Sequence, residues 1–411
     1  MIWFFLIISL YLVKRRTKFS LFSPLVLFYV FFLLSIIFST AYHYWMPYSC
    51  KFNIAQLDRI NNEEFWISID VFVKMLIYFS IGVLFYKYIF NVRKNVNFRF
   101  DLKIKLPPIN TSNLVSISMG LIAFDVFLVS ILYGKELFIR NSYAVDYSKL
   151  GLMLLEYSLL FLIFLGAVLF KEKKSFSRVI ALFVTLLCIG FGSRMATIYL
   201  LVYFFVIFIL YLNRKKKILY MVFGLPVILL FFGYNLSLRF SDNHGLGPYL
   251  YLPFSSSSEI LKNTFFNIYY TLVFGVFATF KTLVKYPFNY HYLYTSLNPS
   301  PGFLTDWYII YKELRVNPYA PFTGIGEIFS YPNIAFFFYF FIGMFFAHSE
   351  RIIQRLFLNK KIVVGFILFL LTSAFIPYSF EYNLRSCVRF IYYAMIFIYL
   401  QKLFSKIKIK K

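Results

Sequence analysis

The sequence predicts an all-α integral membrane protein that crosses the bilayer many times. Two features of its composition point this way: the 411-residue chain is 61% hydrophobic and 23% aromatic, and only 14% of its side chains are charged. A soluble domain carries roughly one quarter charged residues. The third observation is that mostly apolar runs, about as long as a bilayer-crossing helix requires, recur from end to end. We expect about eleven transmembrane helices, within a range of ten to twelve.

The expected spans form two groups separated by a long polar segment. Their approximate limits are residues 1–13, 20–45, 66–86, 113–133, 150–170, 179–193, 195–212, 218–234, 332–347, 362–378 and 388–400. This arrangement predicts three parts: helices with short loops in 1–233, a large extracytoplasmic loop in 234–331, and C-terminal helices with a basic tail in 332–411.

Basic residues set the predicted orientation, because cytoplasmic loops hold the excess of Lys and Arg. Of the 42 basic residues, 27 lie in six clusters, at 14–18, 87–105, 171–178, 213–217, 351–361 and 402–411. All six fall on one side of an eleven-span arrangement, which places the N-terminus outside and the C-terminus in the cytoplasm. Since the clusters alternate with apolar runs, topology accounts for the net charge of +25 and nucleic-acid binding is not expected.

A further apolar run, residues 264–280, lies inside the long polar segment. If it crossed the membrane once, the next basic linker would lie on the wrong side. We therefore predict a helix packed at the outer interface or dipping into it. A twelfth span is the alternative interpretation.

Arginines at the outer ends of spans are the candidate phosphate ligands. Arg194 lies between two spans in GFGSRMATIYLLVYF, and Arg239 follows the next outward-going span. A guanidinium keeps its charge and donates several hydrogen bonds, which suits a diphosphate. The alternatives are contacts of Arg194 with lipid head groups and an ion pair of Arg239 with Asp242. Arg385 and Arg389 are secondary candidates for the same phosphate site.

The long polar segment contains the other candidate site residues. Glu327, in TGIGEIF, and His291 are the candidate general bases. A helix cap or dipole partner is the alternative role for Glu327. Aromatic rings with polar tips suit sugar faces, and Tyr292, Trp307 and Tyr308 are the candidates here, although membrane-interface anchoring explains part of this aromatic content.

Charged residues within the expected spans have a different pattern. Asp70 and Lys74 are one helical turn apart, which predicts a structural ion pair. Asp125 and Glu156 have no partner in sequence and are expected to face the protein interior. The chain lacks nucleotide-binding glycine motifs, an outer DxD pair and any Cys–His metal spacing, so we predict no metal or cofactor site.

Several of these features together resemble a known family. They are the GSR turn between two spans, a second arginine after the next span, one large outer loop, and PFTGIGEIFSYPN leading into an aromatic span with FFIGMFF. This pattern resembles the O-antigen and capsular-repeat polymerases of the Wzy type, which are related to the O-antigen ligases. The resemblance covers the architecture and roughly residues 190–348. It implies a GT-C-like fold and a place in the bacterial cytoplasmic (inner) membrane.

The resemblance also implies an activity, a glycosyltransferase at the outer face of that membrane. A growing glycan on undecaprenyl diphosphate is the donor, and a hydroxyl of one lipid-linked repeat unit attacks its anomeric carbon. The lipid diphosphate leaves without metal, cofactor or nucleotide sugar, and Arg194 and Arg239 stabilise its charge. The partners implied are the lipid-linked glycans, a chain-length regulator and a flippase.

Three alternatives remain open. The first is an O-antigen ligase, which the sequence barely separates from a polymerase. The second is a flippase or other transporter, against which the long outer segment argues. The third is a structural membrane protein, in which the outer arginines would be incidental.

Overall fold

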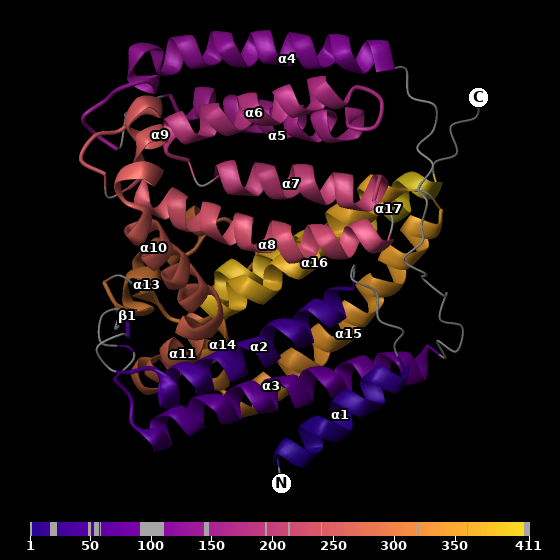
Figure 1. Cartoon of the computed structure of the whole chain (residues 1–411). Coiled ribbons are helices and arrows are strands. Elements are labelled where there is room, and N and C mark those ends of the chain that lie inside the picture. Colours follow the sequence, from indigo (N-terminus) through magenta and orange to yellow (C-terminus); the bar gives the residue numbers. More distant parts are fainter. Residues whose placement is uncertain are drawn as a thin grey trace. The chain divides into compact units, whose positions relative to one another are not determined.

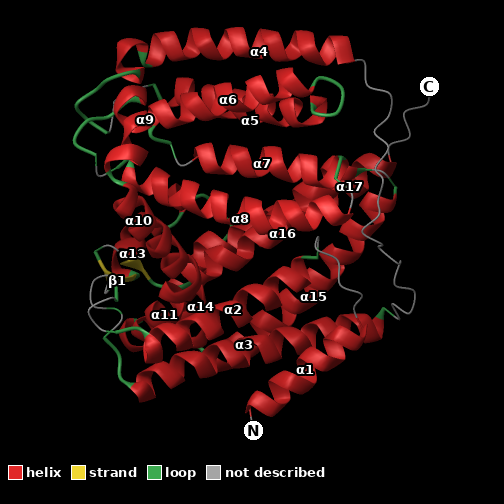
Figure 2. Cartoon of the chain, in the orientation of Figure 1, coloured by secondary structure: helices red, strands yellow, loops and turns green. Residues whose placement is uncertain are grey.

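Helices form nearly all of the secondary structure in the computed structural model of the chain (Figure 2). The structure describes residues 2–16, 23–47, 51–52, 57, 59–90, 111–143, 148–193, 195–212, 214–239, 241–318, 320–359 and 361–406. By its internal contacts the chain divides into two compact units. Unit 1 comprises residues 1–99 and 269–411, and unit 2 comprises residues 100–268.

Unit 1 combines long helices with a group of short elements (Figure 1). The long helices are α1 (Ile2–Arg16), α2 (Pro24–Trp45), α3 (Asn62–Ile89), α15 (Pro332–Leu358), α16 (Ile362–Glu381) and α17 (Leu384–Lys406). The short elements are the π-helical turn η4 (Tyr270–Phe274), α11 (Gly275–Lys285), α12 (Tyr290–Leu297), η5 (Gly302–Leu304), α13 (Trp307–Glu313), the hairpin β1 (Arg315–Asn317) and β2 (Ala320–Pro321), and α14 (Gly324–Phe329).

Aromatic rings and close backbone contact hold α2, α3 and α15 together. The ring of Phe28 stacks on Phe79 with centroids 3.8 Å apart, and Phe346 meets Phe28 edge-on at 5.6 Å. Two glycines bring α3 and α15 into contact: a Cβ on Gly82 would lie 1.9 Å from the Phe340 carbonyl oxygen, and one on Gly343 would lie 2.1 Å from that of Phe79. Backbones this close leave no room for a side chain, which makes glycine necessary at both positions.

Unit 2 is a layered set of helices with its own core. Its elements are α4 (Thr111–Leu132), the 3₁₀ helix η3 (Gly134–Leu137), α5 (Lys149–Leu169), α6 (Lys174–Phe191), α7 (Met195–Leu210), α8 (Arg214–Ser237), α9 (Leu246–Ser255) and α10 (Ser257–Tyr269), whose last residue belongs to unit 1. Leu162, Ile163 and Ile180 are fully buried in the core between α5, α6 and α7. Polar links join the same helices, with Ser177 and Tyr203 hydroxyls 2.8 Å apart.

The described helices confirm a multi-pass membrane architecture. Eight of them are long and apolar enough to cross a membrane. They run over Pro24–Trp45, Asn62–Ile89, Thr111–Leu132, Leu150–Leu169, Lys174–Phe191, Ser257–Lys285, Pro332–Leu358 and Val364–Glu381. Shorter apolar helices occupy Trp3–Val13, Met195–Phe208 and Val222–Ser237, and α17 contains the last expected span.

The apolar run 264–280 belongs to a helical stretch, Ser257–Lys285, that is long enough to cross the membrane. The described contacts of its part in unit 1, however, lie near the ends of the neighbouring helices α2 and α3. The Ser39 hydroxyl, near the end of α2, donates to the Leu272 carbonyl, and the Phe277 ring lies 5.8 Å from that of Phe65 in the first turn of α3. These contacts favour a helix packed across the span ends over one that runs alongside them.

Each unit has one basic end and one end rich in polar loops. In unit 1, Ser23 donates to Glu350 and Tyr86 bonds His348 at the end near the 351–361 cluster, whereas α11 to α14 gather at the opposite end. In unit 2, the 171–178 cluster lies at one end of α5 and α6 and the Gly192 turn at the other.

The expected ion pair within a span is confirmed. Lys74 Nζ lies 2.5 Å from an Asp70 carboxylate oxygen, one turn away on α3. Asp125 is buried, as expected, with neither carboxyl oxygen hydrogen-bonded to a described residue.

The predicted boundaries at 233 and 331 follow membrane topology, whereas the units follow packing, since α3 and α15 join residues distant in sequence.

The glycine contacts between α3 and α15 make a testable prediction. Gly82→Ala and Gly343→Ala force a methyl group into a backbone oxygen, so each should destabilise the protein by about 1–3 kcal/mol. Thermal unfolding in detergent, followed by size-exclusion chromatography, measures the loss. Gly120→Ala, where a Cβ meets no atom within 4 Å, is the matched control and should not lower the unfolding temperature. Equal unfolding temperatures for all three variants would contradict this packing.

Candidate functional site

The GSR turn closes the end of α6 with a left-handed glycine. Gly192 has φ +69°, a conformation that favours glycine, and the amide of Ser193 donates to the Cys188 carbonyl at 2.9 Å. A Cβ on Gly192 would lie 3.0 Å from the Tyr143 ring. The turn is therefore fixed by the bond from Ser193 to Cys188 and by the Tyr143 ring packed beside Gly192. Arg194 itself lies outside the described residues.

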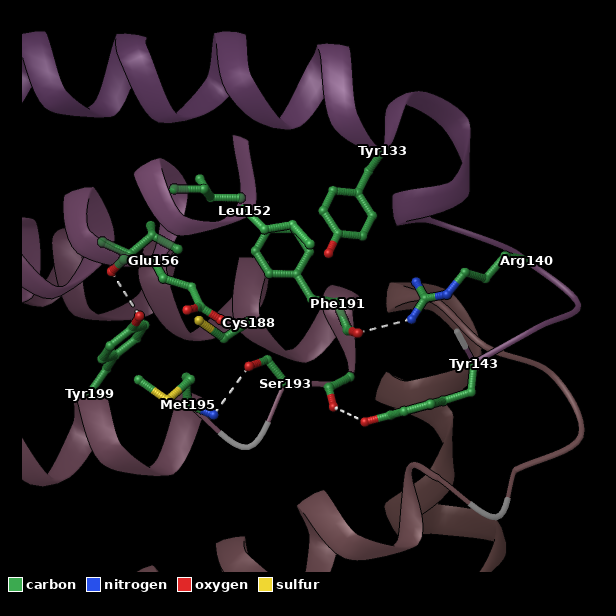
Figure 3. A pocket seen from close by; sticks show the side chains of 13 residues that line it. Tyr133, Arg140, Tyr143, Leu152, Glu156, Cys188, Phe191, Ser193, Met195 and Tyr199 are labelled. Carbon is green, nitrogen blue, oxygen red and sulfur yellow. Dashed lines mark hydrogen bonds between the residues drawn. The ribbon is translucent and has the colours of Figure 1, made fainter. Parts of the chain in front are cut away.

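Arg140, which the sequence analysis did not identify, holds this turn. Its Nη1 donates to the Gly190 carbonyl at 2.7 Å. Its Nη2 donates to the Phe191 carbonyl at 3.0 Å, as Figure 3 shows. Two further bonds go to the carbonyls of Glu136 and Ser142 in its own loop. A buried cation at a helix C-terminus satisfies end carbonyls and opposes the helix dipole, so Arg140 acts mainly as a structural cap.

Among the arginines that the structure describes near this turn, Arg239 is exposed. Its guanidinium lies 5.5 Å from the centre of the Tyr143 ring, and the Tyr143 hydroxyl donates to the Gly192 carbonyl at 3.0 Å. Within the described residues the guanidinium forms no hydrogen bond or ion pair, and the alternative pair with Asp242 is absent. Its N–H groups are therefore available to a ligand beside the Gly192 turn.

A pocket of about 200 Å³ opens beside the same turn, between α5, α6 and the start of α7 (Figure 3). Its polar lining includes Arg140, Tyr143, Glu156 and Ser193, and the Glu156 side chain turns toward Cys188. Glu156 lines this pocket, but its side chain is exposed rather than turned into the protein interior as expected, because the pocket opens to the surface of α5.

In unit 1, hydroxyl contacts position the short helix that carries Glu327. Thr323 caps α14, its side chain accepting from the Gly326 amide at 3.1 Å, and its own amide donates to the Thr282 hydroxyl at 3.2 Å. At the same end, the Gly324 amide donates to the Tyr382 carbonyl at 2.7 Å. These bonds press α14 between α11 and the start of α17 and leave Glu327 fully buried.

Burial dominates the chemistry of Glu327. It raises the pKa of this carboxyl to about 8, and the facing Leu384 amide and Ser296 hydroxyl offset only part of the rise. Neither carboxyl oxygen completes a hydrogen bond to a described residue. Glu327 is therefore mostly protonated at neutral pH, and its side chain is not exposed to solvent.

Arg385, at the start of α17, is hydrogen-bonded to the same loop. Its side chain is 1% exposed, Nη1 donates to the Thr295 carbonyl and Nη2 to that of Ser300 at 2.5 Å. The guanidinium also lies 5.0 Å from the Trp307 ring centre. This geometry makes Arg385 and Trp307 parts of the loop's framework, and their roles toward phosphate and sugar stay predictions.

The accessible candidates lie on the surface of this loop. His291 Nε2 is 3.4 Å from a carboxylate oxygen of Asp306, with both side chains more than half exposed. Tyr292 bonds Glu313, and Tyr308 is exposed. Arg389 is half-buried one turn beyond Arg385.

The structure thus places the predicted residues in two groups. His291, Tyr292, Trp307 and Glu327 lie in the loop elements of unit 1, Arg385 contacts them from α17 of the same unit, and Arg239 belongs to unit 2. Arg140 could have been predicted in the way Arg194 was, as an isolated basic residue on the side where such residues are rare. Among the described residues, no three acidic, histidine or cysteine side chains are placed to hold a metal ion.

Comparisons of the chain with protein-family models, with curated proteins and with solved structures find no match.

The environment of Glu327 predicts a pH-dependent stability. Its pKa is raised from 4.5 to about 8 on folding, so its contribution to stability is fully present below about pH 4.5 and is lost as pH rises toward 8, by at most about 5 kcal/mol. Glu327→Gln stays neutral and should flatten this fall, which thermal unfolding at pH 5 to 9 measures.

The exposed Glu259 provides the control, since Glu259→Gln removes a carboxylate without changing a buried group. Its stability should follow the pH dependence of the parent protein. Parallel pH curves for Glu327→Gln and the parent would show that Glu327 is ionised in the folded state.

Proposed function

We propose that this protein joins lipid-linked oligosaccharide repeat units into a surface polysaccharide, by glycosyl transfer between polyprenyl-diphosphate carriers. The observation that carries the proposal is the guanidinium of Arg239 at the Gly192 turn, which forms no hydrogen bond or ion pair within the described residues. A departing diphosphate needs a permanent cation with N–H groups left to donate, and Arg239 meets both conditions as far as the described part of the chain is concerned. The resemblance to Wzy-type polymerases supplies the reaction.

The distribution of charge supports an outer-face reaction. Basic clusters mark the cytoplasmic ends of helices, and in each unit the candidate residues lie at the end away from those clusters. Each unit, oriented by its own basic residues, thus turns its candidate residues outward. Polyprenyl-linked glycans displayed on that face would meet Arg239 and the His291 loop from the same compartment.

In the proposed step, a sugar hydroxyl of the acceptor attacks the anomeric carbon of the donor. The new glycosidic bond forms as the bond from carbon to diphosphate oxygen breaks, and the carrier leaves as its diphosphate. The hydroxyl proton passes to a general base. His291 is the accessible candidate, with Asp306 close enough to orient its ring, whereas Glu327 is buried.

Deleting the gene in its host and separating the surface polysaccharide by electrophoresis tests the activity. Loss of a polymerase leaves a single repeat unit on its anchor. Long lipid-linked chains without an acceptor would instead indicate a ligase, repeat units trapped on the inner leaflet a flippase, and an unchanged polysaccharide would refute all three.

Complementing the deletion with Arg239 variants tests the proposed diphosphate site. Arg239→Ala should lower polymer yield by about 10²–10³-fold at equal membrane abundance, because a fixed donor to the leaving group is lost. Arg239→Lys, which keeps the charge without the planar fork, should retain part of the yield. Arg178→Ala, at an exposed arginine on the basic end of α6, is the control and should give normal polymer. Normal polymer from both Arg239 variants would remove Arg239 from the mechanism.

A further inference from the structure

The pocket beside the Gly192 turn is joined to Arg239 through one residue. Tyr143 lines the pocket, and its ring lies under the Arg239 guanidinium. Its hydroxyl is fixed by a 3.0 Å bond to the Gly192 carbonyl, another part of the pocket wall. A ligand held by Arg239 therefore lies beside Tyr143, a residue of the pocket wall.

The polar groups of the pocket that can still bind a ligand are mainly hydrogen-bond acceptors, because the guanidinium of Arg140 is already engaged. Arg140 spends four N–H bonds on backbone carbonyls. The Glu156 carboxylate, in contrast, forms no hydrogen bond or ion pair with a described side chain, and only its backbone carbonyl is engaged, by Tyr199. The Ser193 hydroxyl accepts from the Met195 amide and keeps its own proton to donate.

The size and walls of the pocket limit what enters. Its volume of about 200 Å³ is below the roughly 300–1,000 Å³ of sites for drug-sized ligands, so a single ring fits and an oligosaccharide does not. Leu152, Leu155 and Phe191 supply an apolar wall beside Glu156. An apolar face next to a carboxylate matches a sugar ring, which has C–H faces and hydroxyl donors at its edge.

We propose that this pocket holds the sugar joined directly to the diphosphate of the donor, with its hydroxyls donating to Glu156 while its phosphate binds Arg239. The inference rests on the proposed function and deepens it, because it assigns recognition of the first sugar to unit 2. The ligand class is a glycosyl phosphate. The pocket would select which carrier-linked glycans are polymerised by their innermost sugar.

Binding to the purified full-length protein in lipid nanodiscs tests this assignment without turnover. The probes are a panel of aldohexose and N-acetylhexosamine 1-phosphates, with glycerol 1-phosphate as a ligand that carries phosphate and no ring. At least one sugar phosphate should bind ten-fold or more tightly than glycerol 1-phosphate. Arg239→Ala should weaken both kinds of ligand at least ten-fold.

Variants of the pocket separate the sugar from the phosphate. Glu156→Gln should reduce the sugar's advantage to less than three-fold and leave glycerol 1-phosphate binding unchanged. Leu152→Phe, which fills the pocket from a half-buried position, should do the same by exclusion and keeps the test valid if Glu156→Gln misfolds. Glu172→Gln, at an exposed carboxylate beyond the opposite end of α5, is the matched control.

The assignment is overturned if no sugar phosphate exceeds glycerol 1-phosphate, which would indicate a lipid head-group site, or if the sugar's advantage survives both pocket variants. Neither result refutes polymerisation, which the gene deletion tests separately. The opposite combination is also informative. If the sugar phosphate binds more tightly than glycerol 1-phosphate through Glu156, but deleting the gene leaves the polysaccharide unchanged, the sugar site stands and the proposed function is refuted.

Discussion

The bonds between Arg140 and the last carbonyls of α6 are the interaction on which the candidate site of unit 2 depends. They satisfy helix-end acceptors that would otherwise lack partners, and they place positive charge at the negative end of the helix dipole. With α6 ended in this way, the left-handed Gly192 can turn the chain into α7. The same turn accepts the Tyr143 hydroxyl, and Tyr143 in turn supports Arg239.

Three arginines near span ends therefore have different chemical uses. Arg140 and Arg385 are buried, and their N–H groups hold backbone carbonyls, so each stabilises a loop. Arg239 is exposed and uncommitted within the described chain. The number and position of basic residues in the sequence do not tell a structural arginine from a ligand-binding one. The difference depends on which backbone carbonyls the folded chain places within hydrogen-bonding distance of each guanidinium. An arginine that binds a substrate must have donors left over.

The sequence predicts the helices well and the site only in part. Apolar runs mark where helices form, since a bilayer-crossing segment must satisfy its backbone internally, and the Asp70–Lys74 pair follows from helical spacing. Burial of Glu327 does not follow from sequence, because it results from α14 packing against α11 and α17, segments distant along the chain. The pocket around Glu156 was missed for the same reason: its walls come from four separate segments.

The central claim is that Arg239 and the His291 loop face the same compartment, outside the cytoplasm. Labelling single cysteines in a background without the three native ones tests it directly. Arg239→Cys and His291→Cys should both react with a membrane-impermeant maleimide in intact spheroplasts, and Arg178→Cys only after permeabilisation. Labelling of positions 239 and 291 from opposite sides, or of both only after permeabilisation, would contradict the account.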